Sequence, residues 1–213
     1  LDLAGGRLVA VKRGGGWHVS LLYSIAEAAR MESEDPVPFP APDQAIAARG
    51  AVDPESAVRE AIDAGLAEDV ERLIELTDPE EMRVLHDYGS ILVDAAEGET
   101  VEGFEVDDLT LSVADGPNGS KIVRADTMTM RFGDEDVSSE ISYDGSCATT
   151  SVTYTEAYRQ EYVDEWGEED ASWLEDQTYR FCNDDALGPD AVLGWLSAPA
   201  GLEVVVTEHD GEW

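Results

Sequence analysis

The chain has 213 residues, enough for one or two domains, and 43% of them are hydrophobic, enough to build a core. The 48 aspartates and glutamates outnumber the 13 lysines and arginines, and the formal net charge is −35. Such a surface repels phosphate backbones and anionic lipid headgroups, so binding to nucleic acid or to a membrane surface is disfavoured. A strongly solvated surface explains the acidity, with cation binding as the alternative. No run of 18 apolar residues occurs, so direct membrane insertion within these residues is not expected.

A ten-residue pattern occurs twice, as LVAVKRGGGW at 8–17 and as VVVTEHDGEW at 204–213. Each copy is an aliphatic run, a charged residue, a turn containing glycine and a tryptophan. Alignment without gaps pairs Trp17 with Trp213. The repetition predicts that the chain is a section of a longer tandem-repeat protein. Residues 1–30 are then the C-terminal hairpin remnant of a preceding module, with its strands in places equivalent to the second copy. A signal peptide or membrane anchor would lie upstream.

The first elements in chain order are a hairpin and a linker. Strand-like residues at 8–12 and 17–23 flank a triple-glycine turn, and a short helix is expected over 24–30. Residues 31–52 hold four prolines at alternate positions, a pattern typical of a stiff, extended spacer. They are therefore predicted to link the remnant to a second module, which spans 53–213 and is truncated at its last hairpin.

Three helices are expected to open that module. Asp53 is a good N-cap for the first, and a short second helix follows. Asp78 is predicted to cap the third helix, with Glu81 completing a capping box. Apolar residues recur at helical spacing along the third helix: Met82, Leu85, Tyr88 or Gly89, Leu92 and Ala96. Packing of this stripe on a sheet would bury Leu85 almost completely.

Most of the remaining chain is predicted to form antiparallel strands. They are expected at 104–114, 121–132, 137–143, 147–154, 177–182 and 202–208, with a short helix at 189–196. The acidic, aromatic segment 155–176 is either a hairpin extension or an inserted helix. Helices followed by an antiparallel sheet indicate an α+β fold in which the helices cover one face of the sheet.

Alternation along the predicted strands indicates which side chains face the helices. The inward set is Leu109, Leu111, Val113, Met128, Met130 and Phe132. Asp126 shares the parity of Met128 and could therefore face a pocket between sheet and helices. Asp108 has the opposite parity to Leu109 and should face solvent.

Cys147 and Cys182 are the only cysteines, and no further cysteine or histidine lies nearby to complete a zinc site. Their strand-like surroundings predict a disulfide between neighbouring antiparallel strands, with two free thiols as the alternative. That pairing places Ala148 opposite Phe181. Phe181 and Tyr179 then share a face suited to a core, and the cysteines take the opposite face. A disulfide implies an oxidising, extracytoplasmic compartment.

The segment DPESAVREAIDAGLAEDVERLIEL, which begins at Asp53, and the closing DGEW resemble the opening helices and last strand of the NTF2-like (cystatin-like α+β) superfamily. GGGWHVSLLYSIAEAAR and HDGEW also look like tandem modules of actinobacterial surface proteins or lipoproteins of unknown function. The first resemblance implies a curved antiparallel sheet with the N-terminal helices on its concave side. Some members of the superfamily use that cone-shaped pocket for catalysis.

The residues that could line such a pocket are Tyr88, Asp126, Met128 and Met130. His86, Asp87 and Tyr88 point about 100° apart on a helix, so they do not converge on one substrate, and the first two are expected in solvent. No catalytic set, metal site or cofactor motif is identified. One hypothesis is a non-enzymatic extracytoplasmic module that binds an unidentified protein or small ligand, or acts as a spacer. The other is a small-molecule enzyme of the ketosteroid isomerase or polyketide cyclase type.

Overall fold

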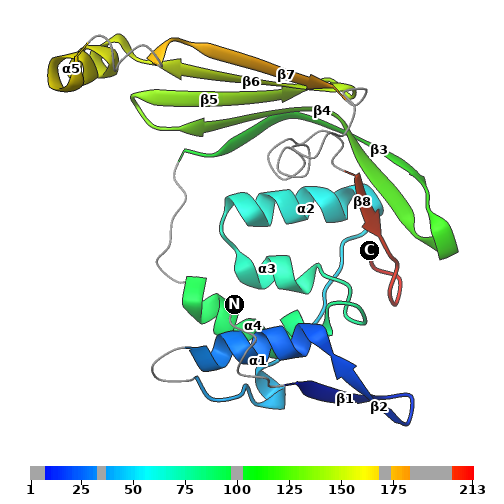
Figure 1. The fold of residues 1–213 in the computed structure, drawn as a ribbon. Coiled ribbons are helices and arrows are strands. Elements are labelled where there is room, and N and C mark those ends of the chain that lie inside the picture. The colour runs from blue at the N-terminus through cyan, green and yellow to red at the C-terminus, as the bar shows by residue number, and fades with distance from the viewer. Residues whose placement is uncertain (1–7, 33–36, 97–102, 168–173, 183–202) are drawn as a thin grey trace.

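The structure is a computed structural model that describes residues 8–32, 37–96, 103–167, 174–182 and 203–213 (Figure 1). In chain order its elements are β1 (Val9–Arg13), β2 (Gly16–Ser20), α1 (Leu21–Glu32), η2 (Pro42–Gln44), α2 (Pro54–Leu66), α3 (Val70–Glu75), α4 (Arg83–Ala96), β3 (Glu105–Asp115), η3 (Pro117–Gly119), β4 (Lys121–Gly133), β5 (Val137–Tyr143), β6 (Cys147–Tyr154), α5 (Glu156–Trp166), β7 (Gln177–Cys182) and β8 (Glu203–Val206). The helix predicted at 189–196 lies outside the described residues.

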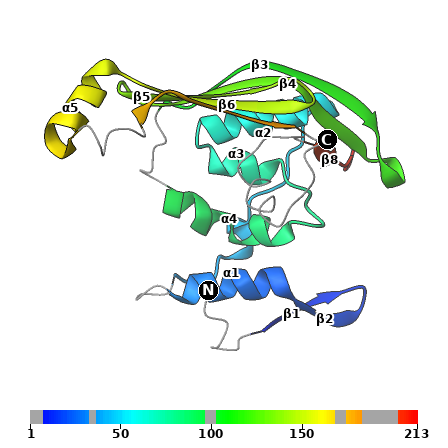
Figure 2. The same cartoon turned by 45° about the horizontal axis from the view of Figure 1, so that its top comes forward.

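The larger sheet has six antiparallel strands. Five of them follow the order β3-β4-β5-β6-β7, and β8 pairs with residues 121–124 at the start of β4. Figure 2 shows this sheet as one layer, with α2, α3 and α4 on one side of it and α1 farther away. β1 and β2 form a separate two-stranded sheet beside α1. The predicted α+β fold class is therefore confirmed.

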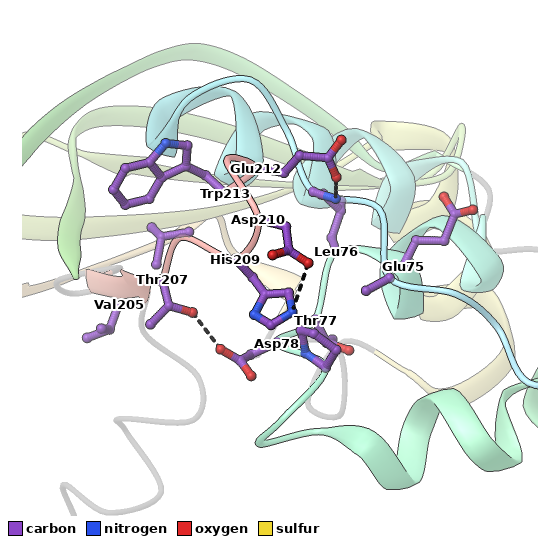
Figure 3. Close-up of a pocket in the computed structure, with 14 residues that line it drawn as sticks. Glu75, Leu76, Thr77, Asp78, Val205, Thr207, His209, Asp210, Glu212 and Trp213 are labelled. Atoms are coloured by element: carbon purple, nitrogen blue, oxygen red, sulfur yellow. Dashed lines mark hydrogen bonds and ion pairs between the residues drawn. The ribbon is translucent and has the colours of Figure 1, made fainter. Parts of the chain in front are cut away.

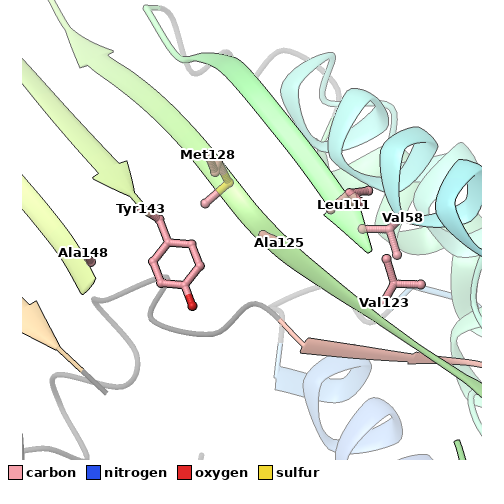
Figure 4. Close-up of a cluster of buried hydrophobic side chains, with 7 residues drawn as sticks. All are labelled: Val58, Leu111, Val123, Ala125, Met128, Tyr143 and Ala148. Carbon is pink, nitrogen blue, oxygen red and sulfur yellow. The ribbon is translucent and has the colours of Figure 1, made fainter. Parts of the chain in front are cut away.

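The main core lies between α2 and the sheet. α2 begins as predicted, because the Asp53 carboxylate accepts a hydrogen bond from an amide of the first turn and a proline occupies the first helical position. The buried cluster joins one residue of the helix to six of the sheet (Figure 4): Val58, Leu111, Val123, Ala125, Met128, Tyr143 and Ala148. Met130 packs against this cluster. The expected packing of a helix on the face that carries the two methionines is confirmed for α2.

A bulge in the β3–β4 pair changes which residues of β4 face the core. Thr110 pairs with Thr127, while the next residue of β3 pairs with Ala125. Asp126 is therefore an additional residue on β4, and the inward positions change from odd to even numbers on passing it. Asp126 itself is exposed. The expectation that it faces a pocket is wrong, because strict alternation does not continue through a bulge.

The helices beneath α2 form a second buried cluster. α4 begins at Arg83, later than the predicted N-cap, and packs on α3 and α1 rather than on the sheet. Tyr23 of α1 joins Val84 and Tyr88 of α4 in this cluster. Leu85 packs at its edge and is only half-buried, so the prediction of nearly complete burial is wrong. Helical periodicity shows that α4 is amphipathic but does not specify which element covers its apolar face.

His86 is buried in the helical layer, contrary to the prediction that it faces solvent. One ring nitrogen lies 2.9 Å from the Ile46 carbonyl oxygen, and the other lies 3.1 Å from the Thr77 carbonyl oxygen. Asp87 is half-buried and accepts a hydrogen bond from the Tyr23 hydroxyl. His86 therefore connects α4 to the linker and to the α3–α4 loop.

A disulfide joins Cys147 of β6 to Cys182 of β7, as predicted. The predicted register is also confirmed, with Ala148 opposite Phe181. Phe181 and Tyr179 are nevertheless exposed, whereas Cys147 is buried. The expected core on that face is absent from β7, because β7 is the edge strand and α2 lies over β3, β4 and β8 instead.

The structure decides between the two alternatives for one further segment and shortens a predicted strand in another. The segment 155–176 contains a helix, α5, whose N-cap is Thr155; the hydroxyl of Thr155 accepts a hydrogen bond from the Tyr158 amide. The strand predicted over 17–23 ends earlier, because α1 begins at Leu21.

Candidate functional site

A cavity of about 340 Å³ lies where the C-terminal residues meet the helical layer (Figure 3). Its walls come from the linker near Ala48, the end of α3, the α3–α4 loop and residues 205–213. The polar lining residues are Glu75, Thr77, Asp78, Thr207, His209, Asp210 and Glu212. Trp213 completes the lining on the side of the linker. The cavity is therefore rich in carboxylates and is built from segments far apart in the sequence.

The C-terminal residues form a two-residue hairpin turn at Asp210 and Gly211. Both have positive φ, 54° and 89°. The flanking residues, His209 and Glu212, exchange two backbone hydrogen bonds of 2.8 and 3.1 Å. Positive φ at both central positions is the geometry of a type I′ turn, which an Asp-Gly pair favours.

The first copy of the repeat makes the same turn. Gly14 and Gly15 have φ values of 56° and 84°, and Arg13 pairs with Gly16 across them. In both copies the aligned tryptophan follows this closing pair. The strands that precede the turns have different partners, since β1 pairs with β2 whereas β8 pairs with β4. The repeat is thus structural at its turn.

Backbone contacts anchor the C-terminal turn to the linker. The Ala51 amide donates to the Trp213 carbonyl oxygen at 2.6 Å, and the Trp213 amide donates to the Ala51 carbonyl oxygen at 2.9 Å. The Gly50 amide donates to the Glu212 carboxylate at 2.9 Å. A methyl group at Gly50 would lie 2.6 Å from the Trp213 carbonyl oxygen, so this approach requires glycine.

Asp78 anchors the same turn from the α3–α4 loop. Its carboxylate accepts a hydrogen bond of 2.6 Å from the Thr207 hydroxyl and two more from the amides of Glu80 and Glu81. The Thr207 hydroxyl, followed by the Glu81 amide, holds the pKa of the Asp78 carboxyl below its ordinary value. Asp78 therefore does not cap α4 itself. It caps the turn that precedes α4, and it also binds the C-terminal segment through Thr207.

Glu75 is matched by two arginines. Arg49 donates to its carboxylate at 2.9 Å and Arg72 at 3.0 Å. At the rim, the His209 ring lies 3.6 Å from the Asp210 carboxylate, and both side chains are at least half exposed. Most carboxylates of the cavity thus hold the C-terminal turn and α3 in place. These contacts suit a structural joint or a binding surface.

The four predicted pocket residues lie apart from this cavity. Tyr88 is buried between α1 and α4, and its hydroxyl donates to Glu27 at 3.2 Å. Burial, followed by the Glu27 carboxylate, raises the pKa of Tyr88 to about 12. Met128 and Met130 belong to the main core. Asp126 accepts a hydrogen bond from a serine on the exposed side of β3. The sequence signal for the observed site is the repeated turn, although its pattern predicts the last hairpin of a repeat module rather than a cavity.

No protein-family model, curated protein or solved structure matches this chain. Within the described residues, no three histidine, cysteine, aspartate or glutamate side chains are grouped so that they could hold a metal ion. The described helices include none that is both long and apolar enough to cross a membrane.

Proposed function

We propose that the chain belongs to a non-enzymatic, extracytoplasmic tandem-repeat protein, in which it links neighbouring modules and presents a surface to a protein partner or small ligand. The observation that carries this proposal is the repeated turn. Two segments at opposite ends of the chain share a ten-residue pattern, the same type I′ geometry and a tryptophan in the same place. Arrays of such units provide reach and multivalency.

The details of the C-terminal site favour a joint over an active site. Asp78 and Glu212 accept hydrogen bonds from the Thr207 hydroxyl and from backbone amides, and Glu75 accepts from two arginines outside the lining. The enzyme alternative depended on Asp126 in a sheet–helix pocket, and that carboxylate is exposed. We therefore rank the binding and spacing function above catalysis.

Compartment and family complete the proposal. The disulfide between Cys147 and Cys182 favours an oxidising compartment, and hence secretion or display at the cell surface. An α2 helix lying over an antiparallel sheet is compatible with the NTF2-like superfamily, which we propose as the fold family.

Surface labelling of intact cells tests the compartment and the repeat together. Lys121 lies outside the β1–β2 hairpin and keeps 33% of its side chain exposed, so a membrane-impermeant amine reagent should label the native protein without lysis. Mass spectrometry of the extracted protein, with thiols blocked, should find no free cysteine and more than one copy of the module. A protein labelled only after lysis and carrying two free thiols, or a mature chain with a single module, would contradict the proposal.

A further inference from the structure

The two copies of the repeat bury opposite faces of their aligned strands, β1 and β8. In β8, Val204 and Val206 pack against the main core, while Val205 is 58% exposed. In β1, the aligned order is reversed. Val9 and Val11, which align with residues 205 and 207, pack against the cluster around Tyr23 and Tyr88. Each copy therefore leaves open the face that the other copy buries.

The open face of the first copy carries three exposed large apolar side chains. Leu8 is 69% exposed, Trp17 is 71% exposed and Val19 is 61% exposed. Ala10 pairs with Val19, and Lys12 pairs with Trp17, so these side chains lie on one face of the β1–β2 hairpin. Exposed apolar surface of this kind marks an interaction site.

The C-terminal copy shows how that face is covered. There, β8 adds to residues 121–124 of β4 beside α2, and the aligned tryptophan exchanges backbone hydrogen bonds with Ala51. Trp17 occupies the matching position in the first copy, and β1 has β2 on one side only. The first copy thus has the residues that would pair with a β4 strand and bond to the backbone of an Ala51. Within the described structure it contacts neither.

We infer that the open face and edge of the β1–β2 hairpin dock onto a second module of this same fold. There, β1 would pair with the second module's β4 strand in the way that β8 pairs with β4 in this module. This inference rests on the proposed tandem function and names the partner of one surface. The hairpin would then lie between two modules. One of its faces packs on the second module's sheet and α2, and the other packs on α1 and α4 of this one. Such a hairpin fixes the orientation of neighbouring modules, because it is part of both cores.

A head-to-tail fusion tests the docking directly. Residues 1–213 are joined to residues 18–213 of a second copy, so that Trp213 takes the place of Trp17. Amides of residues 203–213 at the junction should exchange hydrogen at least tenfold more slowly than in the single chain. V19D in the second copy should abolish that protection, whereas V19D in the single chain should change neither its melting temperature nor its exchange.

The matched control is H18D, an exposed position on the opposite face of the hairpin, which should leave the junction protected. A fusion in which junction amides exchange as in the single chain, or in which V19D has no effect, overturns the inference. These outcomes do not depend on where the native protein resides or how many modules it contains. A failed docking test and a failed surface-labelling test are therefore distinguishable.

Discussion

Ala51 and Trp213 exchange two backbone hydrogen bonds, although one lies in the linker before α2 and the other follows β8. This contact joins the residues just before α2 to the end of the segment that follows β8. The neighbouring Gly50 supports it, because its backbone amide donates a hydrogen bond to the Glu212 carboxylate. The C-terminal turn is therefore an integral part of the fold, held by contacts of high sequence separation.

Substitution of Gly50 by alanine should release this turn. The new methyl group would lie 2.6 Å from the Trp213 carbonyl oxygen and 2.8 Å from the Glu212 β-carbon, so the turn or the linker must move. Overpacking of this kind costs about 1–3 kcal/mol. Urea denaturation should show that loss, and hydrogen exchange should show faster exchange at the amides of Ala51 and Trp213.

Gly65→Ala is the matched control. Gly65 lies within α2, and a methyl group there meets no atom within 4 Å. Since alanine has a higher helix propensity than glycine, this variant should be neutral or gain up to about 1 kcal/mol. Equal stability of the two variants would show that the Gly50 contact does not constrain the fold.

The hydrogen bond between Thr207 and Asp78 should make stability depend on pH with a predictable sign. A carboxyl whose pKa is lowered by folding stabilises the protein above its unfolded pKa, and that contribution is lost as the pH falls through the folded pKa. Asp78→Asn should therefore destabilise by a constant amount above about pH 5. The difference from the unmodified chain should shrink below the ordinary aspartate pKa of 3.8.

A double-mutant cycle assigns that effect to the pair. In a Thr207→Val background, Asp78→Asn should cost less, because the hydroxyl donor is already gone, and the coupling should be about 0.5–3 kcal/mol. Additive effects of the two substitutions at neutral pH would mean that the backbone amides alone account for the lowered pKa.

Truncation of core side chains should distinguish the two apolar clusters. Met128 is buried between α2 and the sheet, so Met128→Ala should cost about 2–5 kcal/mol. Leu92 belongs to the stripe that the sequence identifies on α4, yet it is 41% exposed. Leu92→Ala should therefore cost less than about 1 kcal/mol. Similar losses in a urea titration would mean that α4 packs more deeply than the structure shows.

Local signals in the sequence predicted local features well. The Asp53–Pro54 pair marked the start of α2, and the register of β6 and β7 followed from combining alternation with the cysteine pair. These predictions succeeded because cap chemistry and strand alternation act between residues that are adjacent or directly paired.

Features that depend on distant contacts were not predictable in the same way. The bulge at Asp126 inserts a residue with no distinctive sequence signal, and it reversed the parity on which the pocket prediction rested. His86 is polar on a helix, yet its partners come from the linker and the α3–α4 loop. The docking of Trp213 on Ala51 likewise depends on chain segments that only the fold brings together.

The last prediction concerns the disulfide, whose removal should destabilise the sheet at β6 and β7. The two cysteines are separated by 35 residues, and a closed loop of this size is expected to contribute about 3–4 kcal/mol by restricting the unfolded chain. The Cys147→Ser, Cys182→Ser double variant should lose about that amount in a urea titration. Reductant should destabilise the unmodified chain similarly and leave the double variant unchanged. Because Phe181 and Tyr179 are exposed on β7, little packing replaces the bond, and faster amide exchange should be strongest in that strand. A double variant as stable as the oxidised chain would show that strand pairing alone holds β7 in place.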